Sequence, residues 1–151
     1  MARAATRGIA ALVKAGVPYE VLHLEVISDL WEAPDIAAEQ EFKTLIIALP
    51  AEVAVAIVPV PSRLCLKAAA AALGVAKAGM AEPTAAERAT GYVVGGISPF
   101  GQRKRLWAVV DSSALSWDRM LCSAGKRQWD VAVAPQDLIR LTGAITADIR
   151  S

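Results

Sequence analysis

The segment from Gly91 to Gln102 limits most strongly what this chain can fold into. It reads Gly-Tyr-Val-Val-Gly-Gly-Ile-Ser-Pro-Phe-Gly-Gln and holds four of the ten glycines of the 151-residue chain. Glycine permits main-chain conformations that a Cβ forbids, and Pro99 restricts Ser98 to extended conformations, so the segment predicts a stiff loop. Its bare N–H groups can form a concavity of donors for an oxyanion or a phosphate. Taken alone, a Gly-Gly pair fits a plain turn between two strands better, so the neighbouring motifs have to decide.

Helical and strand patterns interleave along the chain, with no long linker, repeat or low-complexity block between them. We therefore expect a single α/β domain over residues 1–151, a length that suits one sizeable core. Two apolar, β-rich runs around Pro50 predict a hairpin at the centre of a sheet. Helices are expected over residues 4–15, 66–73, 83–89 and 136–141, and strands over residues 19–25, 43–48, 53–58, 75–80, 106–110, 120–123 and 131–133. Residues 30–41 show no regular period, apart from a short helical turn expected at Pro34.

The cysteines and the histidine exclude several kinds of site. Cys65 and Cys122 lie far apart with no metal-ligand spacing, which indicates a reduced, cytoplasmic protein. His23 is the only histidine, so a multi-histidine metal site cannot be built, nor a Ser-His relay without His23, and its apolar neighbours favour a structural role. The longest apolar run is broken by prolines and a glutamate, so no membrane span is expected.

Basic residues gather in two short runs, although the formal net charge is only +1. The first run is Arg103-Lys104-Arg105, directly after the glycine-rich loop, and the second is Lys126-Arg127. A solvated face is the ordinary explanation of such runs. Their position beside candidate site loops favours binding to the phosphates of a nucleic acid instead.

Three motifs in one order resemble the YbaK/EbsC family of editing deacylases, in the prolyl-tRNA synthetase insertion-domain superfamily. They are Phe42-Lys43-Thr44-Leu45, Gly95-Gly96-Ile97-Ser98-Pro99 and Ser123-Ala124-Gly125-Lys126-Arg127, and the resemblance extends over residues 42–149. It implies a mixed, mostly antiparallel or barrel-like sheet surrounded by helices. It also implies hydrolysis in trans of mischarged Cys-tRNA(Pro), with tRNA as a partner, prolyl-tRNA synthetase as a second candidate partner, and no cofactor or metal.

The resemblance also implies roles for individual residues. Lys43 matches an essential lysine of the family, and would hold the terminal adenosine phosphate or the ester, with Thr44 beside it in the pocket. Gly95 matches a pocket glycine whose backbone lies against the aminoacyl carbonyl. Ser123 would orient the amino group or water, and Asp130 would order Lys43 or bind the substrate ammonium. The remaining substrate-binding candidates are Gly96, Ser98, Pro99 and Gly125, and the tRNA-binding candidates are Arg103, Lys104, Arg105, Lys126 and Arg127.

Plainer explanations of the same residues stay open. Lys43 also fits an edge lysine at the start of a strand, and Ser123 fits a hydroxyl that caps a turn. Asp130 also fits a surface carboxylate paired with Arg127.

An aminoacyl-tRNA ester is already activated, so its hydrolysis needs anchoring and oxyanion stabilisation more than a strong base. In members of the family specific for cysteine, the substrate thiol is thought to attack its own ester carbonyl, and the lack of a base here is consistent with that chemistry. Two alternatives remain: an Ala-tRNA(Pro) deacylase of the same superfamily, and a non-catalytic module that docks on tRNA or prolyl-tRNA synthetase.

The segment between His23 and Phe42 departs from the family. Glu25 stands where a pocket tyrosine is expected, only nineteen residues lie from Leu24 to Phe42, and Trp31 matches no family position. A missing pocket wall loosens selectivity before it stops the chemistry, because fit to an apolar pocket is worth only about 1–3 kcal/mol per methylene. We therefore expect poor discrimination of cysteine from alanine or serine.

Overall fold

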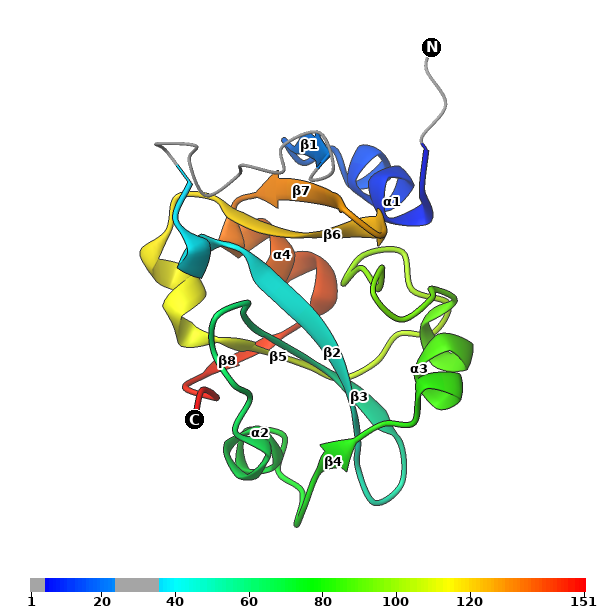
Figure 1. Cartoon of the computed structure of the whole chain (residues 1–151), viewed down its shortest axis with the longest axis vertical. Helices are drawn as coiled ribbons and strands as arrows, with labels where there is room; N and C mark the ends of the chain where they lie inside the picture. The colour runs from blue at the N-terminus through cyan, green and yellow to red at the C-terminus, as the bar shows by residue number, and fades with distance from the viewer. Residues whose placement is uncertain (1–4, 24–35) are drawn as a thin grey trace.

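The computed structural model describes residues 5–23 and 36–151, which form a three-stranded and a five-stranded sheet with four α-helices (Figure 1). The smaller sheet is antiparallel, in the order β1 (Glu20–His23), β7 (Trp129–Val133) and β6 (Met120–Lys126). The larger sheet is mixed, in the order β4 (Gly79–Met80), β2 (Phe42–Ala48), β3 (Val53–Pro59), β5 (Ala108–Asp111) and β8 (Ile145–Ala147). The expected mixed α/β fold is confirmed. The barrel-like alternative is not, because over the described residues the two sheets remain separate and open.

The β2–β3 hairpin organises the core, as the two apolar runs predicted. Its antiparallel register runs from Phe42 opposite Pro59 to Ala48 opposite Val53, and β3 pairs with β5 on its other side. Because side chains alternate along a strand, the hairpin supplies both cores of the molecule. Its inner face joins the core between the sheets, through Ile46, Val55 and Ile57. Its other face joins a second core with Ile47, Ala54, Ala56, Val58, Ala69, Val109 and Ile149.

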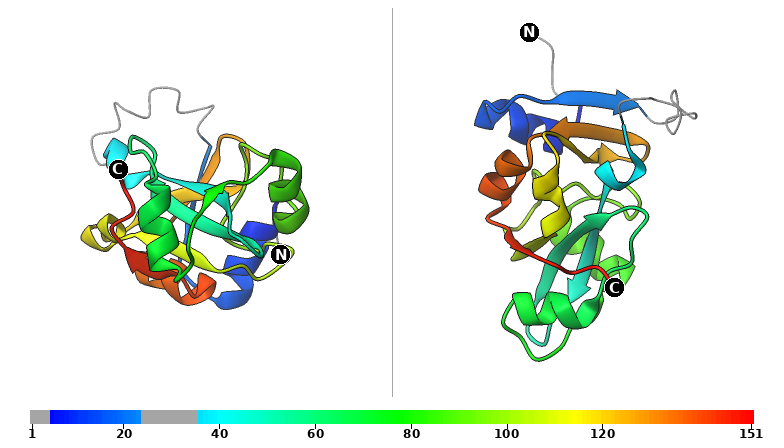
Figure 2. Two further views of the ribbon diagram at one scale, coloured as in Figure 1. Left: turned by 90° about the horizontal axis from the view of Figure 1, so that it is seen from below. Right: turned by 90° about the vertical axis from the view of Figure 1, so that its left-hand side faces the viewer.

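Helices α1 (Arg7–Ala15), α2 (Leu66–Ala72) and α3 (Pro83–Thr90) lie at the outside of the molecule, and α4 (Pro135–Thr142) lies at one side, at the level between the smaller sheet and strands β5 and β8 (Figure 2). Helix α1 lies beside the smaller sheet, and α2 lies at the opposite end of the molecule. Helix α3 covers the edge near β4, and α4 follows β7. The described residues contain no helix long and apolar enough to cross a membrane.

Local signals explain where most helices begin and end. Thr6 caps α1 by accepting a hydrogen bond from the Ile9 N–H at 3.0 Å, so the helix starts later than the expected residue 4. Glycines in the left-handed conformation end three of the helices: Gly16 at φ 70°, Gly91 at φ 80° and Gly143 at φ 67°.

Several strand predictions were wrong in length or missed. The strand expected over residues 75–80 shrinks to the two residues of β4, and β5 begins at Ala108 rather than at residue 106. Strand β6 continues to Lys126, because it turns into β7 through Gln128, whose φ is 66°. Strand β8 was not predicted. The end of the expected strand over 19–25 and the turn expected at Pro34 lie outside the described residues.

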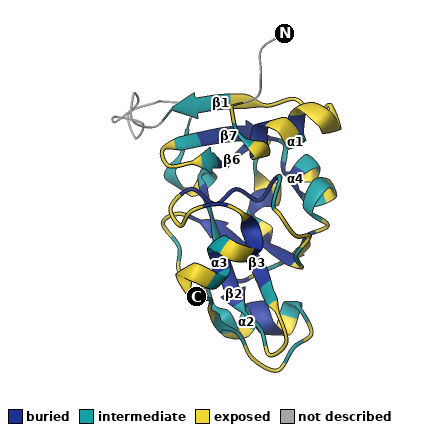
Figure 3. Ribbon diagram, turned by 90° about the vertical axis from the view of Figure 1, so that its right-hand side faces the viewer, coloured by how far each residue is buried: buried dark blue, intermediate teal, exposed yellow. Residues whose placement is uncertain are grey.

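The glycine-rich loop after α3 is tied by its own hydrogen bonds. The Phe100 N–H donates to the Ser98 hydroxyl at 3.1 Å, and the Gln102 side chain donates to the Ser98 carbonyl at 2.9 Å. The Tyr92 hydroxyl donates to the Phe100 carbonyl, which closes the loop on itself. These bonds hold the shape of the loop. The loop packs against the start of α1, where a Cβ on Gly101 would meet the Arg7 carbonyl group, on the side of the molecule seen in Figure 3.

Candidate functional site

A cavity of about 390 Å³ lies where β2, α3, the glycine-rich loop and the β6–β7 hairpin meet. Six of the sequence candidates line it, from three segments far apart in the chain: Lys43, Thr44, Gly95, Ser123, Lys126 and Asp130. Apolar side chains make up most of the other lining, including Phe42, Leu45, Ile46, Val60, Met80, Ala86 and Ile97. Tertiary packing therefore gathers the central residues of all three motifs around one space.

Four substrate-binding candidates lie outside this lining. Ser98 is fully buried, and its hydroxyl accepts a hydrogen bond inside the loop. Pro99 lines a different cavity, of about 220 Å³. Gly96 packs against the backbone of the β6–β7 turn, where a Cβ would come 3.0 Å from the Arg127 nitrogen. Gly125, at φ 110°, packs against the Tyr92 ring. In the structure these four residues shape the loop and the hairpin around the cavity.

The two basic runs are placed differently from one another. Lys126 lines the cavity, with its Nζ 4.6 Å from the centre of the Trp129 ring. Arg127 lies over Gly95 and donates a hydrogen bond from Nη2 to the Val94 carbonyl at 3.2 Å. Lys104 and Arg105 line the smaller cavity with Pro99, on the other side of the loop. The run 103–105 therefore follows the loop in sequence but does not share its cavity with Lys43.

Two loop residues that line the cavity, Gly95 and Ile97, have backbone N–H groups that make no hydrogen bond among the described residues. The Val94 N–H donates to the Glu87 carboxylate at 2.8 Å, and the Gly96 N–H donates to the Val93 carbonyl at 2.9 Å. Within the described residues, the N–H of Gly95 between them makes no hydrogen bond. Gly95 is exposed and adopts φ 96°, a conformation that favours glycine. An N–H in this position can donate to an oxyanion bound in the cavity.

Two carboxyl groups also line the cavity, and sequence reasoning found only one of them. Asp130 is 7% exposed and forms no ion pair with Arg127, so the surface-carboxylate explanation was wrong. Burial, followed by the negative charge of Glu41, raises the pKa of Asp130 to about 7. Burial also raises the pKa of Glu41. Glu41 directly precedes the Phe-Lys-Thr motif but belongs to no motif itself, so no local signal marked it.

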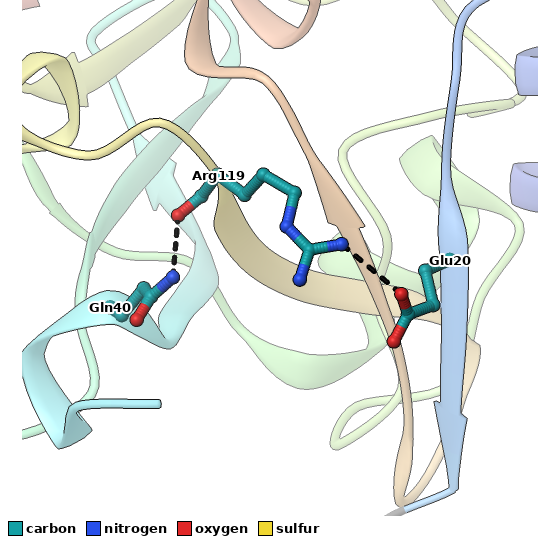
Figure 4. A network of polar contacts seen from close by, with 3 residues as sticks. All are labelled: Glu20, Gln40 and Arg119. Carbon is teal, nitrogen blue, oxygen red and sulfur yellow. Dashed lines mark hydrogen bonds and ion pairs between the residues drawn. The ribbon is translucent and has the colours of Figure 1, made fainter. Parts of the chain in front are cut away.

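A small polar network of Glu20, Gln40 and Arg119 fixes the turn that precedes Glu41 (Figure 4). The Gln40 side chain donates to the Arg119 carbonyl at 2.8 Å, and Arg119 in turn pairs with Glu20 of β1 at 3.1 Å. The Glu41 carbonyl accepts a hydrogen bond from the Val60 N–H at 2.8 Å. The turn before β2 is therefore fixed to the smaller sheet and to the end of β3.

Two hydroxyl groups and the Gln128 amide also line the cavity. Ser123 pairs with Asp130 across the β6–β7 ladder, and its hydroxyl accepts from the Gly125 N–H at 3.1 Å. The Thr44 hydroxyl is buried without a hydrogen-bond partner. Over residues 5–23 and 36–151, no three His, Cys, Asp or Glu side chains are grouped so as to hold a metal ion. The arrangement offers cations, backbone N–H groups without a partner and carboxyl groups around a largely apolar space.

Comparison with known proteins gives one consistent result. Residues 23–141 match the family described as the aminoacyl-tRNA editing domain. Over 140 residues the chain is 31% identical to "Putative Cys-tRNA(Pro)/Cys-tRNA(Cys) deacylase EbsC" of Enterococcus faecalis (strain ATCC 700802 / V583), covering 88% of this chain and 85% of that protein.

Two solved structures share the fold at lower identity. One is "a putative trans-editing enzyme for prolyl tRNA synthetase", with a TM-score of 0.81 and 23% identity over 96% of this chain and 95% of that chain. The other is "hypothetical protein APE2540", with a TM-score of 0.83 and 22% identity over 97% of this chain and 100% of that chain.

Proposed function

We propose that this chain, which belongs to the aminoacyl-tRNA editing domain family, is a trans-acting deacylase that hydrolyses the ester of mischarged Cys-tRNA(Pro). One observation carries the proposal: Lys43, the free N–H of Gly95 and Ser123 meet at one cavity although their motifs are far apart in the chain. The whole chain, residues 1–151, acts as one editing domain.

Lys43 anchors the substrate. Lys43 lines the cavity at the start of β2, and a compact cation with three donors there would hold the terminal phosphate or the ester oxygen. The apolar lining of the cavity takes the amino-acid side chain.

The Gly95 N–H stabilises the transition state. As the ester carbonyl is attacked its oxygen becomes negative, and a preorganised backbone donor at that point contributes about 3 kcal/mol. With a cysteinyl ester, the substrate sulfur attacks the carbonyl carbon and the carbon–oxygen bond to the ribose breaks. The thiol proton ends on the ribose oxygen, which gives a cyclic thioester and free tRNA. Neither Cys65 nor Cys122 lines the cavity, so the protein offers no thiol nucleophile there. The nucleophile is then the thiol of a cysteinyl substrate, or a water molecule when the substrate has no thiol.

The tRNA body is held by the basic runs. Lys126 lies at the cavity and Arg127 lies over the loop beside it, which supports a contact of both with the acceptor end. Arg103, Lys104 and Arg105 lie on the far side of the loop and extend the basic surface for phosphates more distant from the ester. Prolyl-tRNA synthetase is a candidate partner that delivers the substrate.

The test is deacylation of purified Cys-, Ala- and Ser-tRNA(Pro), measured as loss of the aminoacyl group. We expect hydrolysis of Cys-tRNA(Pro) that Lys43→Ala abolishes and that Lys67→Ala, at an exposed position on α2, leaves intact. Hydrolysis confined to Ala-tRNA(Pro) would favour the alanine-specific alternative. Binding of tRNA without hydrolysis of any ester would favour the non-catalytic module.

A further inference from the structure

The loop residues from Val93 to Gly96 form a tight turn whose middle peptide carries the Gly95 N–H. The Gly96 N–H donates to the Val93 carbonyl at 2.9 Å, which closes a four-residue β-turn with Val94 and Gly95 at its centre. Gly95 has φ 96°, whereas the φ of Val94 is not positive, and this combination is that of a type II turn. The peptide between Val94 and Gly95 is therefore the central peptide of that turn.

A type II turn has a second form with the same chain path. Types I and II differ mainly in the direction of the central peptide, because the dihedral angles on its two sides change by about 150° to 170°. Glycine in the third position is compatible with both forms. A trans peptide holds its C=O and N–H groups on opposite edges of one plane, so a flip exchanges the sides of the Val94 carbonyl and the Gly95 N–H. The direction of the Gly95 N–H thus depends on what holds the Val94 carbonyl.

Arg127, in the turn between β6 and β7, holds that carbonyl. Its Nη2 atom donates to the Val94 oxygen at 3.2 Å. The same side chain packs over Gly95, where a Cβ would come 2.8 Å from the Arg127 Nε atom. Gly95 lines the cavity and Arg127 does not. The guanidinium group therefore lies on the carbonyl edge of the peptide, and the N–H edge has no partner among the described residues.

Glu87 of α3 holds the other backbone group of Val94. Its carboxylate accepts a hydrogen bond from the Val94 N–H at 2.8 Å. The carbonyl and the N–H of one residue are thus each bonded to a charged side chain, and such hydrogen bonds are stronger than neutral ones. Over residues 5–23 and 36–151, Arg127 forms no ion pair with an acidic side chain, so its bond to the Val94 carbonyl does not compete with one.

We propose that Arg127 is a positioning residue, which holds the central peptide of this turn in its type II orientation and so keeps the Gly95 N–H directed at the ester carbonyl. The proposal rests on the function proposed above, which brings that carbonyl to Gly95. The positive charge beside the Val94 oxygen also polarises the peptide, which makes the Gly95 N–H a better donor to a developing oxyanion. Without Arg127, the peptide can flip and present its carbonyl oxygen to the substrate, where it repels the oxyanion.

Arg127→Gln separates this role from a contact with tRNA phosphates. Single-turnover deacylation of Cys-tRNA(Pro) over a range of protein concentrations gives two quantities, the rate constant at saturation and the concentration for half-saturation. Loss of a phosphate contact raises the second alone. Loss of the positioning role lowers the first, and we expect a fall of at least about tenfold, a part of the roughly 10²- to 10³-fold that removal of a whole oxyanion donor costs.

Two further variants complete the kinetic test. Arg127→Lys keeps a cationic donor, and should recover part of the rate constant at saturation because the Val94 carbonyl needs only one N–H. Arg88→Gln removes the same charge at an exposed position on α3, and should leave both quantities unchanged.

The direction of the Gly95 N–H is measured without any substrate. Residual dipolar couplings of the ¹⁵N-labelled protein report the direction of each N–H bond, and the coupling of Gly95 in the unmodified protein should fit the type II turn. In Arg127→Gln we expect this coupling to change, or the Gly95 signal to broaden through exchange between the two turn forms. The couplings of strands β2 and β3 should stay the same, which shows that the variant is folded.

The outcomes separate the two proposals. An unchanged Gly95 coupling in Arg127→Gln overturns the positioning role, whatever the variant does to the rate. A rate constant at saturation equal to that of the unmodified protein also overturns it, and Arg127 is then a phosphate contact alone if half-saturation needs more protein. An unmodified protein that hydrolyses no ester overturns the deacylase function, and the Gly95 coupling then decides by itself whether Arg127 holds the peptide.

Discussion

Replacing Asp130 by asparagine should stabilise the protein at alkaline pH. The pKa of this carboxyl group rises from 3.8 to about 7, first because it is buried and second because Glu41 is negative. Between these two values the folded state holds a proton that the unfolded chain has released, so the free energy of unfolding falls as the pH rises. One unit of pKa corresponds to about 1.4 kcal/mol, so ionised Asp130 costs the folded state on the order of 4 kcal/mol above pH 7.

The substitution removes this cost because asparagine has nearly the same shape and cannot ionise. The difference in unfolding free energy between Asp130→Asn and the unmodified chain should grow by about 3 kcal/mol from pH 5 to pH 8. Urea unfolding at both pH values measures it. Asp118→Asn removes an exposed carboxylate just before β6, and should shift the stability by no more than about 0.5 kcal/mol at either pH.

The reasoning would be refuted by a variant whose stability relative to the unmodified chain is the same at pH 5 and pH 8. A variant less stable at pH 8 would refute it too, because the ionised carboxylate would then be stabilised by its surroundings. Either result would mean that the surroundings of Asp130 do not hold it protonated near neutral pH.

Three further predictions concern the proposed activity. Lys43→Arg should lose deacylation as Lys43→Ala does, because a planar guanidinium group does not occupy the space of an ammonium group. The thermal midpoint of the variant should be nearly unchanged. Retained turnover would contradict this prediction. Replacing Arg103, Lys104 and Arg105 together by glutamine should weaken tRNA binding and flatten its dependence on salt without changing which amino acid is removed. An unaltered salt slope in a filter-binding titration would make that run ordinary solvated surface. The unmodified protein should discriminate Cys-tRNA(Pro) poorly from Ala- and Ser-tRNA(Pro). A full-length family segment grafted between His23 and Phe42 should sharpen this selectivity. Strong rejection of Ala- and Ser-tRNA(Pro) by the unmodified protein would contradict the prediction.

The sequence determined the parts of the fold that depend on local signals. The two apolar runs around Pro50 formed the predicted central hairpin, because β-rich runs of that length pair with their nearest neighbour. Gly91 ended its helix as expected, because a left-handed residue at a helix end favours glycine. The family resemblance, read from three motifs in one order, is confirmed by the match over residues 23–141.

Local signals did not predict the positions and lengths of the short strands. Strand β8 has three residues and exists because β5 offers it an edge for parallel pairing. The Ser123 motif was expected to end its strand, but β6 continues because β7 returns beside it. The length of a short strand depends on its partner, which no local pattern identifies.

The tertiary structure alone decided which polar groups meet at the cavity. Sequence reasoning named Asp130 but left open a surface position paired with Arg127, and it gave Glu41 no part at all. Packing of β2 against the smaller sheet buries Asp130 and brings Glu41 to the same cavity. The pKa of a carboxyl group depends on its distance from water and from other charges. These are properties of the folded arrangement, which the order of residues along the chain does not show.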